Sequence, residues 1–184
     1  RHVFFRTKIR MAKLFLCRHG QDEDNANGLL NGHRNMPLTD LGRQQARTVA
    51  DTIHQNLEPF DAILSSPLLR AHHTALEIAS RRNQEVRVEP MLIERDFGIL
   101  TGRPLTDIET VAGDAVLRTE KVTYFLAAEG SETFDALYER AKTLVELVQD
   151  QFHGKRVLLV CHGDIGKMIL AVSRGLSWRE GLLH

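Results

Sequence analysis

Residues 12–20 read AKLFLCRHG, an apolar run that ends at an arginine, a histidine and a glycine. The run predicts a short strand buried on both faces, as in a parallel sheet. In open α/β sheets, ligands bind beyond the carboxyl ends of the strands. Arg18 can form paired hydrogen bonds with a phosphate, and His19 can act as nucleophile, base or ligand. Gly20 lets the backbone approach a bound anion, so we expect an anion site here.

Three further predicted strands end in polar residues. RVLLVC, residues 156–161, resembles the opening run and stops at His162 and Gly163. A strand over residues 61–65 is followed by Ser66 and Pro67, which predict a helix N-cap and first helical position. A strand over residues 85–93 leads directly to Glu94. Polar groups therefore gather at one predicted edge of the sheet: Arg18, His19, Gly20, Arg70, Glu94, His162 and Gly163.

Helical periodicity alternates with these strands. Apolar spacing predicts amphipathic helices after Pro37, from Ser131 to Gly154 and over residues 164–173. A helix after Pro67 should turn inward a stripe of five residues, with Arg70 on another face: Leu68, His72, Ala75, Leu76 and Ala79. Residues 21–37 should be irregular, and residues 105–130 should hold a short helix near 105–111 and an irregular, mobile excursion. We therefore expect an α/β fold, a three-layer α/β/α sandwich with a mostly parallel sheet.

Composition limits the function classes. The chain has 24 basic and 24 acidic residues, and four of the basic ones lie in residues 1–10, which hold no acid. The remaining body is mildly acidic, which argues against nucleic-acid binding. Nothing resembles a membrane span. Cys17 and Cys161 are interpreted as small buried core residues, and a cytoplasmic location is expected.

The polar residues at the strand ends fit phosphoryl transfer through a histidine. A neutral His19 would attack phosphorus, because the ordinary imidazole pKa of about 6.5 leaves free base near neutrality. Arg18 and Arg70 would clamp the phosphate oxygens, and His162, made cationic by the anion, would add a donor. Glu94 would protonate the leaving alcohol and then activate water, which requires a pKa raised by burial.

Six motifs together resemble the histidine phosphatase superfamily, the phosphoglycerate mutase-like group. They are RHGQDEDN (18–25), PLTDLGRQQA (37–46), SSPLLRAHHTA (65–75), ERDFGILTG (94–102), EGSE (129–132) with Arg140, and VCHG (160–163). The resemblance implies His19 as phosphoacceptor, Glu94 as proton donor, and Arg18, Arg70 and His162 as the phosphate pocket. It also implies Asn25 as a phosphate or substrate contact and Asn31 and Gly32 in a substrate loop, with no metal and no cofactor.

The departures from the family pattern concern the substrate. Asp22 replaces the family's usual Thr and begins an acidic triplet, residues 22–24, which we interpret as a solvated loop face. The sharper hypothesis is that these acids repel heavily phosphorylated substrates. The segment between Glu94 and residue 129 is short and lacks an Arg-Arg pair, which favours hydrolysis over phosphoglycerate mutase-type transfer.

The favoured function is a metal-independent phosphatase, in the phosphatase branch of the family, acting on a small phosphorylated metabolite. The alternatives are a cofactor-dependent mutase and a catalytically idle relative that binds phosphorylated ligands. We expect residues 1–10 to be a leader, either added upstream of Met11 or disordered, with a basic transit peptide as the alternative. Residues 11–184 should form one domain that lacks its C-terminal strand, because members usually continue through another strand after His162. The sequence does not indicate the oligomeric state.

Overall fold

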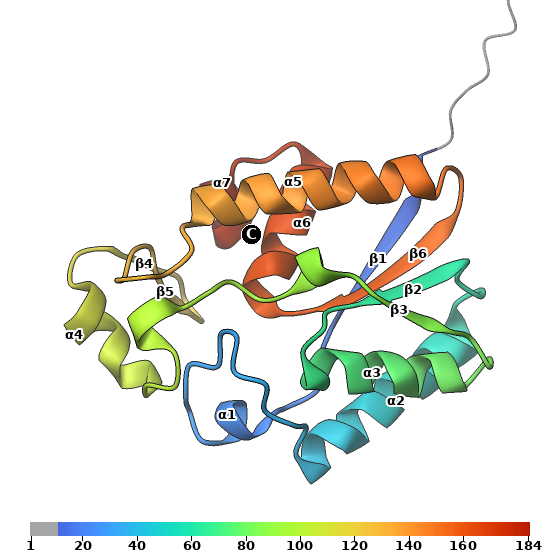
Figure 1. The fold of residues 1–184 in the computed structure, drawn as a ribbon, viewed down its shortest axis with the longest axis horizontal. Helices are drawn as coiled ribbons and strands as arrows, with labels where there is room; N and C mark the ends of the chain where they lie inside the picture. The colour runs from blue at the N-terminus through green and yellow to red at the C-terminus, as the bar shows by residue number, and fades with distance from the viewer. Residues whose placement is uncertain (1–10) are drawn as a thin grey trace, which may run out of the picture.

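A four-stranded parallel sheet forms the middle of the protein in the computed structural model, which describes residues 11–184. Its order is β1 (Lys13–Arg18), β6 (Arg156–Cys161), β2 (Ala62–Ser65) and β3 (Val86–Val88) (Figure 1). Arg18 pairs in register with Cys161, and Ser65 pairs with Val160. The carboxyl ends of these strands therefore meet at one edge, as the sequence predicted. The expected leader lies outside the described residues.

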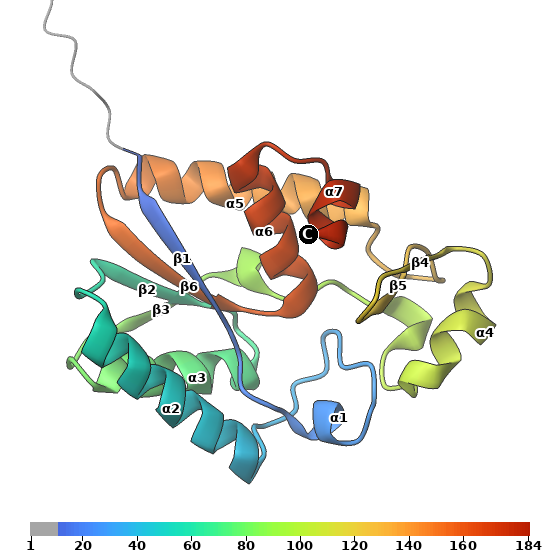
Figure 2. The same ribbon diagram turned by 180° about the vertical axis from the view of Figure 1, so that it is seen from behind.

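Helices cover both faces of the sheet, so the predicted three-layer arrangement is confirmed. Figures 1 and 2 show α2 (Asp40–Asn56) and α3 (Leu69–Ser80) on one face and α5 (Phe134–Gln151), α6 (Gly163–Arg174) and α7 (Trp178–Leu183) on the other. The apolar side chains of β6 alternate between the two resulting cores: Leu158 and Val160 face α3, whereas Val157 and Leu159 face α5 and α6. This two-sided burial explains why β6 is a continuous apolar run. No helix within residues 11–184 is long and apolar enough to cross a membrane.

Two strand predictions need correction. The four residues inside β1 are only half-buried, because β1 forms an edge of the sheet and pairs with β6 alone. The third strand ends at Val88 rather than residue 93, and Pro90 begins a 3₁₀ turn, η1 (Pro90–Leu92). Proline has no backbone N–H for the ladder, so the chain leaves the sheet there.

The helix after Pro67 also differs from its prediction. α3 begins at Leu69, and its N-cap, Leu68, makes no side-chain hydrogen bond. Leu76 was expected to face inward but is 45% exposed, whereas Arg70, expected on another face, is fully buried. Leu68, Ala75 and Ala79 are buried as predicted, so the stripe is wrong chiefly at Leu76. The burial of Arg70 was missed because apolar spacing does not detect a charged side chain.

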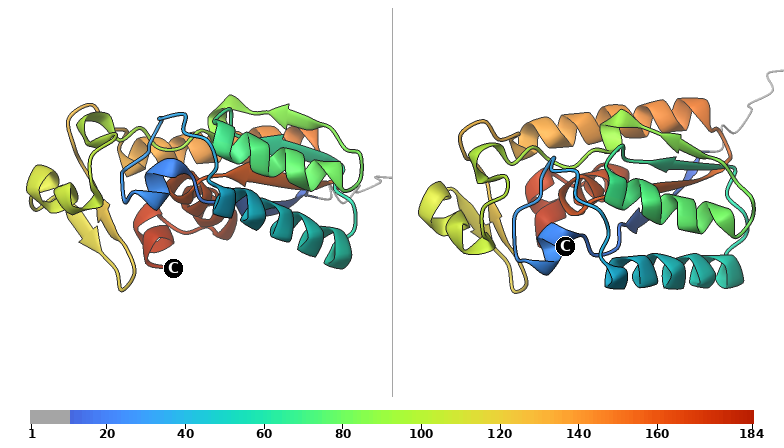
Figure 3. Two further views of the ribbon diagram at one scale, coloured as in Figure 1. Left: turned by 90° about the horizontal axis from the view of Figure 1, so that it is seen from below. Right: turned by 60° about the horizontal axis from the view of Figure 1, so that its bottom comes forward.

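The segments expected to be irregular contain short elements. Residues 21–37 include α1 (Glu23–Ala26), and residues 105–130 include η3 (Leu105–Asp107), α4 (Ile108–Ala112) and an antiparallel pair, β4 (Val116–Arg118) and β5 (Thr123–Phe125). The short helix near residues 105–111 is confirmed. These elements lie beyond the carboxyl ends of the sheet strands (Figure 3) and enclose their own apolar cluster around Leu100 and Phe125. Residues 105–130 thus form a folded segment over that end of the sheet, which we call the cover.

Candidate active site

The structure brings most of the predicted catalytic residues to one end of the sheet. Arg18 ends β1, His19 follows it, and His162 follows β6 as the N-cap of α6. The rings of His19 and His162 lie 5.0 Å apart, measured between centroids. Glu94 is buried, and a Cβ built on Gly163 would lie 3.8 Å from its Oε2 atom and 4.0 Å from Cζ of Arg18. Parallel strands with ends in register account for this convergence.

His19 is held in one tautomer. Its Nδ1 atom lies 2.6 Å from the carbonyl oxygen of Gly20, which can only accept, so Nδ1 carries the proton. The other nitrogen, Nε2, therefore holds the lone pair. Burial lowers the pKa of His19 to about 3; the hydrogen bond to Gly20 opposes this, and the charges of Arg70 and Arg18 add to it. The ring is neutral near pH 7, as a nucleophile requires.

His162 also has a defined proton arrangement. Nε of Arg70 donates to Nδ1 of His162 at 3.2 Å, so the proton of His162 is on Nε2, which donates to Oγ of Ser66 at 2.7 Å. Burial and then the charge of Arg70 lower the pKa of His162 well below its ordinary value. The ring is therefore neutral in this arrangement, and a cationic His162 beside a bound anion stays a prediction.

Ser66 is a site residue that the sequence reasoning missed. Ser66 and Pro67 were interpreted as the start of a helix, yet the hydroxyl of Ser66 accepts a hydrogen bond from Nε2 of His162. A serine before a proline is typical of a helix N-cap, and a serine that bonds a buried side chain looks the same in the sequence. Only the position of His162 in the fold distinguishes the two roles.

Glu94 is tied to the first turn of α6. Its Oε1 atom accepts from the backbone N–H of Arg95 at 2.9 Å and Ile165 at 3.1 Å, and its Oε2 atom accepts from that of Asp164 at 3.2 Å. Burial, followed by the negative charge of Asp164, raises the pKa of Glu94 to about 7, although the three N–H groups oppose this. The carboxyl group therefore exchanges a proton near neutral pH.

Arg95 is a second residue that the sequence reasoning missed. It is 1% exposed, and its guanidinium carbon lies 3.9 Å from the ring centroid of Phe125 and 4.2 Å from that of Phe134. Its Nε donates to Asp164 at 2.8 Å, and its Nη2 donates to the carbonyl of Phe125. Arg95 thus links the cover to α6 beside Glu94. Its place directly after the predicted proton donor was the only sequence signal.

The acidic triplet is not the solvated face that was expected. Asp22 and Asp24 are 0% and 1% exposed, and only Glu23 is exposed. Asp24 pairs with Arg34, whose Nε lies 2.8 Å from its Oδ2. Asp22 pairs with Arg70, whose Nε lies 3.2 Å from its Oδ2. Both carboxylates are buried because each pairs with an arginine, Asp24 with Arg34 ten residues further along the chain and Asp22 with Arg70 of α3.

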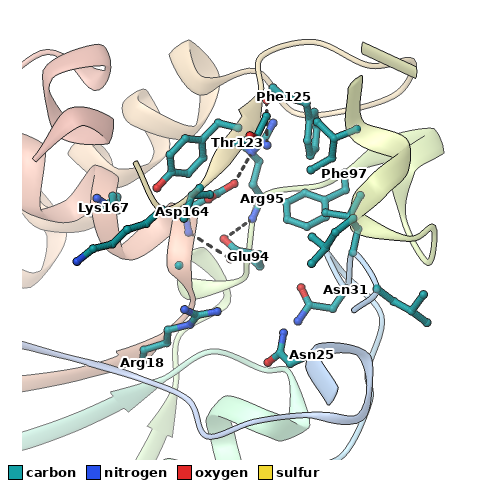
Figure 4. A pocket seen from close by; sticks show the side chains of 18 of the residues that line it. Arg18, Asn25, Asn31, Glu94, Arg95, Phe97, Thr123, Phe125, Asp164 and Lys167 are labelled. Atoms are coloured by element: carbon teal, nitrogen blue, oxygen red, sulfur yellow. Dashed lines mark hydrogen bonds and ion pairs between the residues drawn. The ribbon is translucent and has the colours of Figure 1, made fainter. Parts of the chain in front are cut away.

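A cavity of about 860 Å³ opens beside these groups (Figure 4). One side carries six residues predicted for the site: Arg18, His19, Asn25, Asn31, Glu94 and Gly163. The other side is apolar, with Leu30, Phe97, Ile108 and Phe125, and Lys121 and Lys167 add positive charge. Four predicted site residues lie behind this lining rather than in it: Gly20, Gly32, Arg70 and His162.

The two glycines behind the lining have packing roles. A Cβ on Gly20 would lie 2.3 Å from the carbonyl oxygen of Gly42 in α2, so only glycine permits this approach. Gly32 has φ +47° and lies against the ring of Phe97, where a Cβ would be 3.1 Å away. Its carbonyl accepts from Nη2 of Arg70 at 2.8 Å. Both glycines position site residues.

The cysteines differ from each other in burial. Cys161 is buried, as expected, whereas Cys17 is only half-buried on the edge strand. Burial raises the pKa of both thiols, to about 11 for Cys17 and further for Cys161. Neither thiol is therefore activated as a nucleophile.

Comparison with known proteins agrees with this geometry. A model of the histidine phosphatase superfamily (branch 1) matches residues 14–182. The chain belongs to this superfamily. Phosphoserine phosphatase 1 of Hydrogenobacter thermophilus is 32% identical over 83% of this chain and 71% of its own length. A 2,3-bisphosphoglycerate-dependent phosphoglycerate mutase of Rhizobium etli is 29% identical over 92% of this chain and 82% of its own.

The solved structures agree with the fold of this histidine phosphatase. A mycobacterial glucosyl-3-phosphoglycerate phosphatase has a TM-score of 0.78 and 25% identity, with 94% of this chain and 84% of that chain covered. Both the family and the phosphatase relatives support a phosphatase-type enzyme. The mutase relatives share the same fold, so the reaction must be argued from the site.

Proposed function

We propose that this chain is a metal-independent phosphomonoester hydrolase that works through a phosphohistidine at His19. The observation that carries the proposal is a complementary pair lining one cavity: a neutral imidazole with Nε2 free, and a buried carboxyl, Glu94, with a pKa of about 7. A nucleophile and an acid with opposite proton requirements at the same pH suit two-step transfer.

In the first step, the Nε2 lone pair of His19 attacks phosphorus while the bond to the leaving oxygen breaks. Glu94 gives its proton to that oxygen, so the product is a neutral alcohol. The cationic ring that forms is stabilised by its Nδ1–H bond to the carbonyl of Gly20. Arg18, beside Gly163 at the start of α6, neutralises the phosphoryl oxygens.

In the second step, the Glu94 carboxylate takes a proton from water as the oxygen of that water attacks phosphorus. The bond between phosphorus and Nε2 breaks, its electron pair returns to His19, and inorganic phosphate leaves. Glu94 is protonated again. The cycle therefore needs no group beyond this chain and water.

The substrate that we propose is a small phosphorylated metabolite. A cavity of about 860 Å³ is within the usual size of small-molecule sites. Its apolar side would contact the body of the leaving group. Relatives named for phosphoserine and glucosyl-3-phosphoglycerate support a substrate of this class. We also propose a cytoplasmic location, because both cysteines are free.

A chromogenic aryl phosphate assay with added chelator tests the proposal. We expect His19→Ala to abolish turnover, and Glu94→Gln to reduce it by about 100-fold or more. His73→Ala, which removes an exposed histidine on α3, is the matched control and should leave turnover unchanged. Rapid-quench labelling should give an acid-labile, base-stable adduct at His19. Turnover that survives His19→Ala, or that requires metal, would refute the mechanism.

One further assay separates hydrolase from mutase. The protein is incubated with 3-phosphoglycerate and 2,3-bisphosphoglycerate. Release of inorganic phosphate supports hydrolysis, whereas an isomerised phosphoglycerate indicates a mutase. Binding of these ligands with no reaction indicates an idle relative.

A further inference from the structure

Each of the three guanidinium nitrogens of Arg70 contacts a protein group. Its side chain is 0% exposed. Nη1 and Nη2 donate to the carbonyl oxygens of Arg34 at 2.6 Å and Gly32 at 2.8 Å. Nε lies 3.2 Å from Nδ1 of His162 and 3.2 Å from Oδ2 of Asp22. A phosphate that uses Arg70 must therefore share this cation with a carboxylate that is already present.

Asp22 is held in place from several directions. Its side chain is also 0% exposed. Oδ1 accepts from the backbone N–H of Asn25 at 2.7 Å and caps α1, and Oδ2 accepts from Nδ2 of Asn31 at 2.9 Å. Asn25 and Asn31 both line the cavity. The negative charge of Asp22 is therefore fixed one residue behind the surface that would meet a phosphate.

We propose that Asp22 is an internal counter-ion of Arg70 that weakens the binding of inorganic phosphate and so favours product release. The inference rests on the proposed hydrolase function, for which phosphate must leave in every cycle. A buried carboxylate beside Arg70 reduces the positive charge available to an anion, and it repels a second anion brought close to it. Asp22 acts through Arg70, so it is a positioning residue and not a catalytic one.

A purely structural role for Asp22 makes the opposite prediction. If Asp22 only holds Arg70, Asn25 and Asn31 in place, its removal should weaken phosphate binding. If it competes with phosphate for Arg70, its removal should strengthen that binding. A gain of affinity is a result that structural damage does not produce.

Two variants remove the charge and keep a helix cap. Asp22→Asn retains an oxygen for the N–H of Asn25 but turns its NH₂ group toward Nδ2 of Asn31 and Nε of Arg70, which both donate to Asp22 in the wild type. Asp22→Thr places another good N-cap residue there without an amide group beside Arg70. The matched control is Asp24→Asn. Asp24 is equally buried and lies two residues away, but its partner is the side chain of Arg34.

Calorimetric titration of the full chain with inorganic phosphate tests the proposal without requiring turnover. We expect Asp22→Asn and Asp22→Thr to bind phosphate on the order of tenfold more tightly, the size of one charge-assisted hydrogen bond. Asp24→Asn should change the affinity by a smaller factor, because the charge of Asp24 acts on Arg70 more weakly than that of Asp22. In the aryl phosphate assay, product inhibition by phosphate should strengthen by a similar factor and KM should fall, with no rise in kcat.

The outcomes separate the two proposals. Unchanged or weaker phosphate binding in a folded Asp22 variant overturns the counter-ion role, and so does loss of folding in both variants. A wild-type protein that binds phosphate but hydrolyses no ester overturns the hydrolase proposal instead, while the titration still decides the effect of Asp22 on affinity.

Discussion

Replacing Glu94 with glutamine should stabilise the protein at pH 8 and destabilise it slightly at pH 4. The pKa of Glu94 is raised from 4.5 to about 7 by burial and by Asp164. Between these values the folded state keeps the proton and the unfolded state releases it, so the free energy of unfolding falls as pH rises. The difference of pKa corresponds to about 3 kcal/mol lost by pH 8.

Glutamine carries no charge and avoids this loss, but it gives up a hydrogen bond. One of its terminal atoms can accept from Arg95 and Ile165, whereas its NH₂ group cannot accept from the N–H of Asp164. That costs about 1 kcal/mol. The variant should therefore be about 2 kcal/mol more stable than wild type at pH 8 and about 1 kcal/mol less stable at pH 4, where the carboxyl is mostly protonated in both the folded and the unfolded state. The melting temperature should rise by about 4 to 8 °C at pH 8 and fall by about 2 to 4 °C at pH 4.

Urea unfolding at both pH values measures this change. Glu120→Gln, an exposed carboxylate in the turn between β4 and β5, is the control and should show no comparable dependence on pH. The same wild-type to variant difference at pH 4 and pH 8 for Glu94→Gln would show that burial does not hold the proton on this carboxyl. Glu94 would then lack the proton supply that the mechanism assigns to it.

Four further predictions concern residues in and around the site. Asp164→Asn removes a negative charge that raises the pKa of Glu94. In a plot of kcat against pH, the fall of kcat on the basic side should therefore move to lower pH. Arg95→Met leaves the mostly buried Asp164 without its counter-ion and should lower the free energy of unfolding by about 3 kcal/mol in urea. Gly42→Ala places a Cβ 1.9 Å from a backbone carbonyl oxygen and should cost at least about 2 kcal/mol in a thermal melt. Gly166→Ala in α6, whose Cβ would meet only the sulfur of Cys161 at 3.6 Å, should instead raise stability by about 0.5–1 kcal/mol.

The end of each apolar run was sufficient to predict where the site lies. Arg18 and His19 follow β1, and His162 follows β6, because parallel strands bring their carboxyl ends to one edge. The cover was not predicted in detail, since β4 and β5 have three residues each and cannot show a period. Ser66 was misassigned because its local signal is that of a helix cap.

The amino-acid sequence by itself determined the layer order of the fold, the family, and the kinds of group at the ends of the strands. Only the tertiary structure decided their states: which nitrogen of His19 is free, that Glu94 exchanges its proton near neutral pH, and that Asp22 is buried against Arg70. The physical reason is that strand and helix periods are local, whereas protonation and ion pairing depend on burial and on partners brought together from distant parts of the chain.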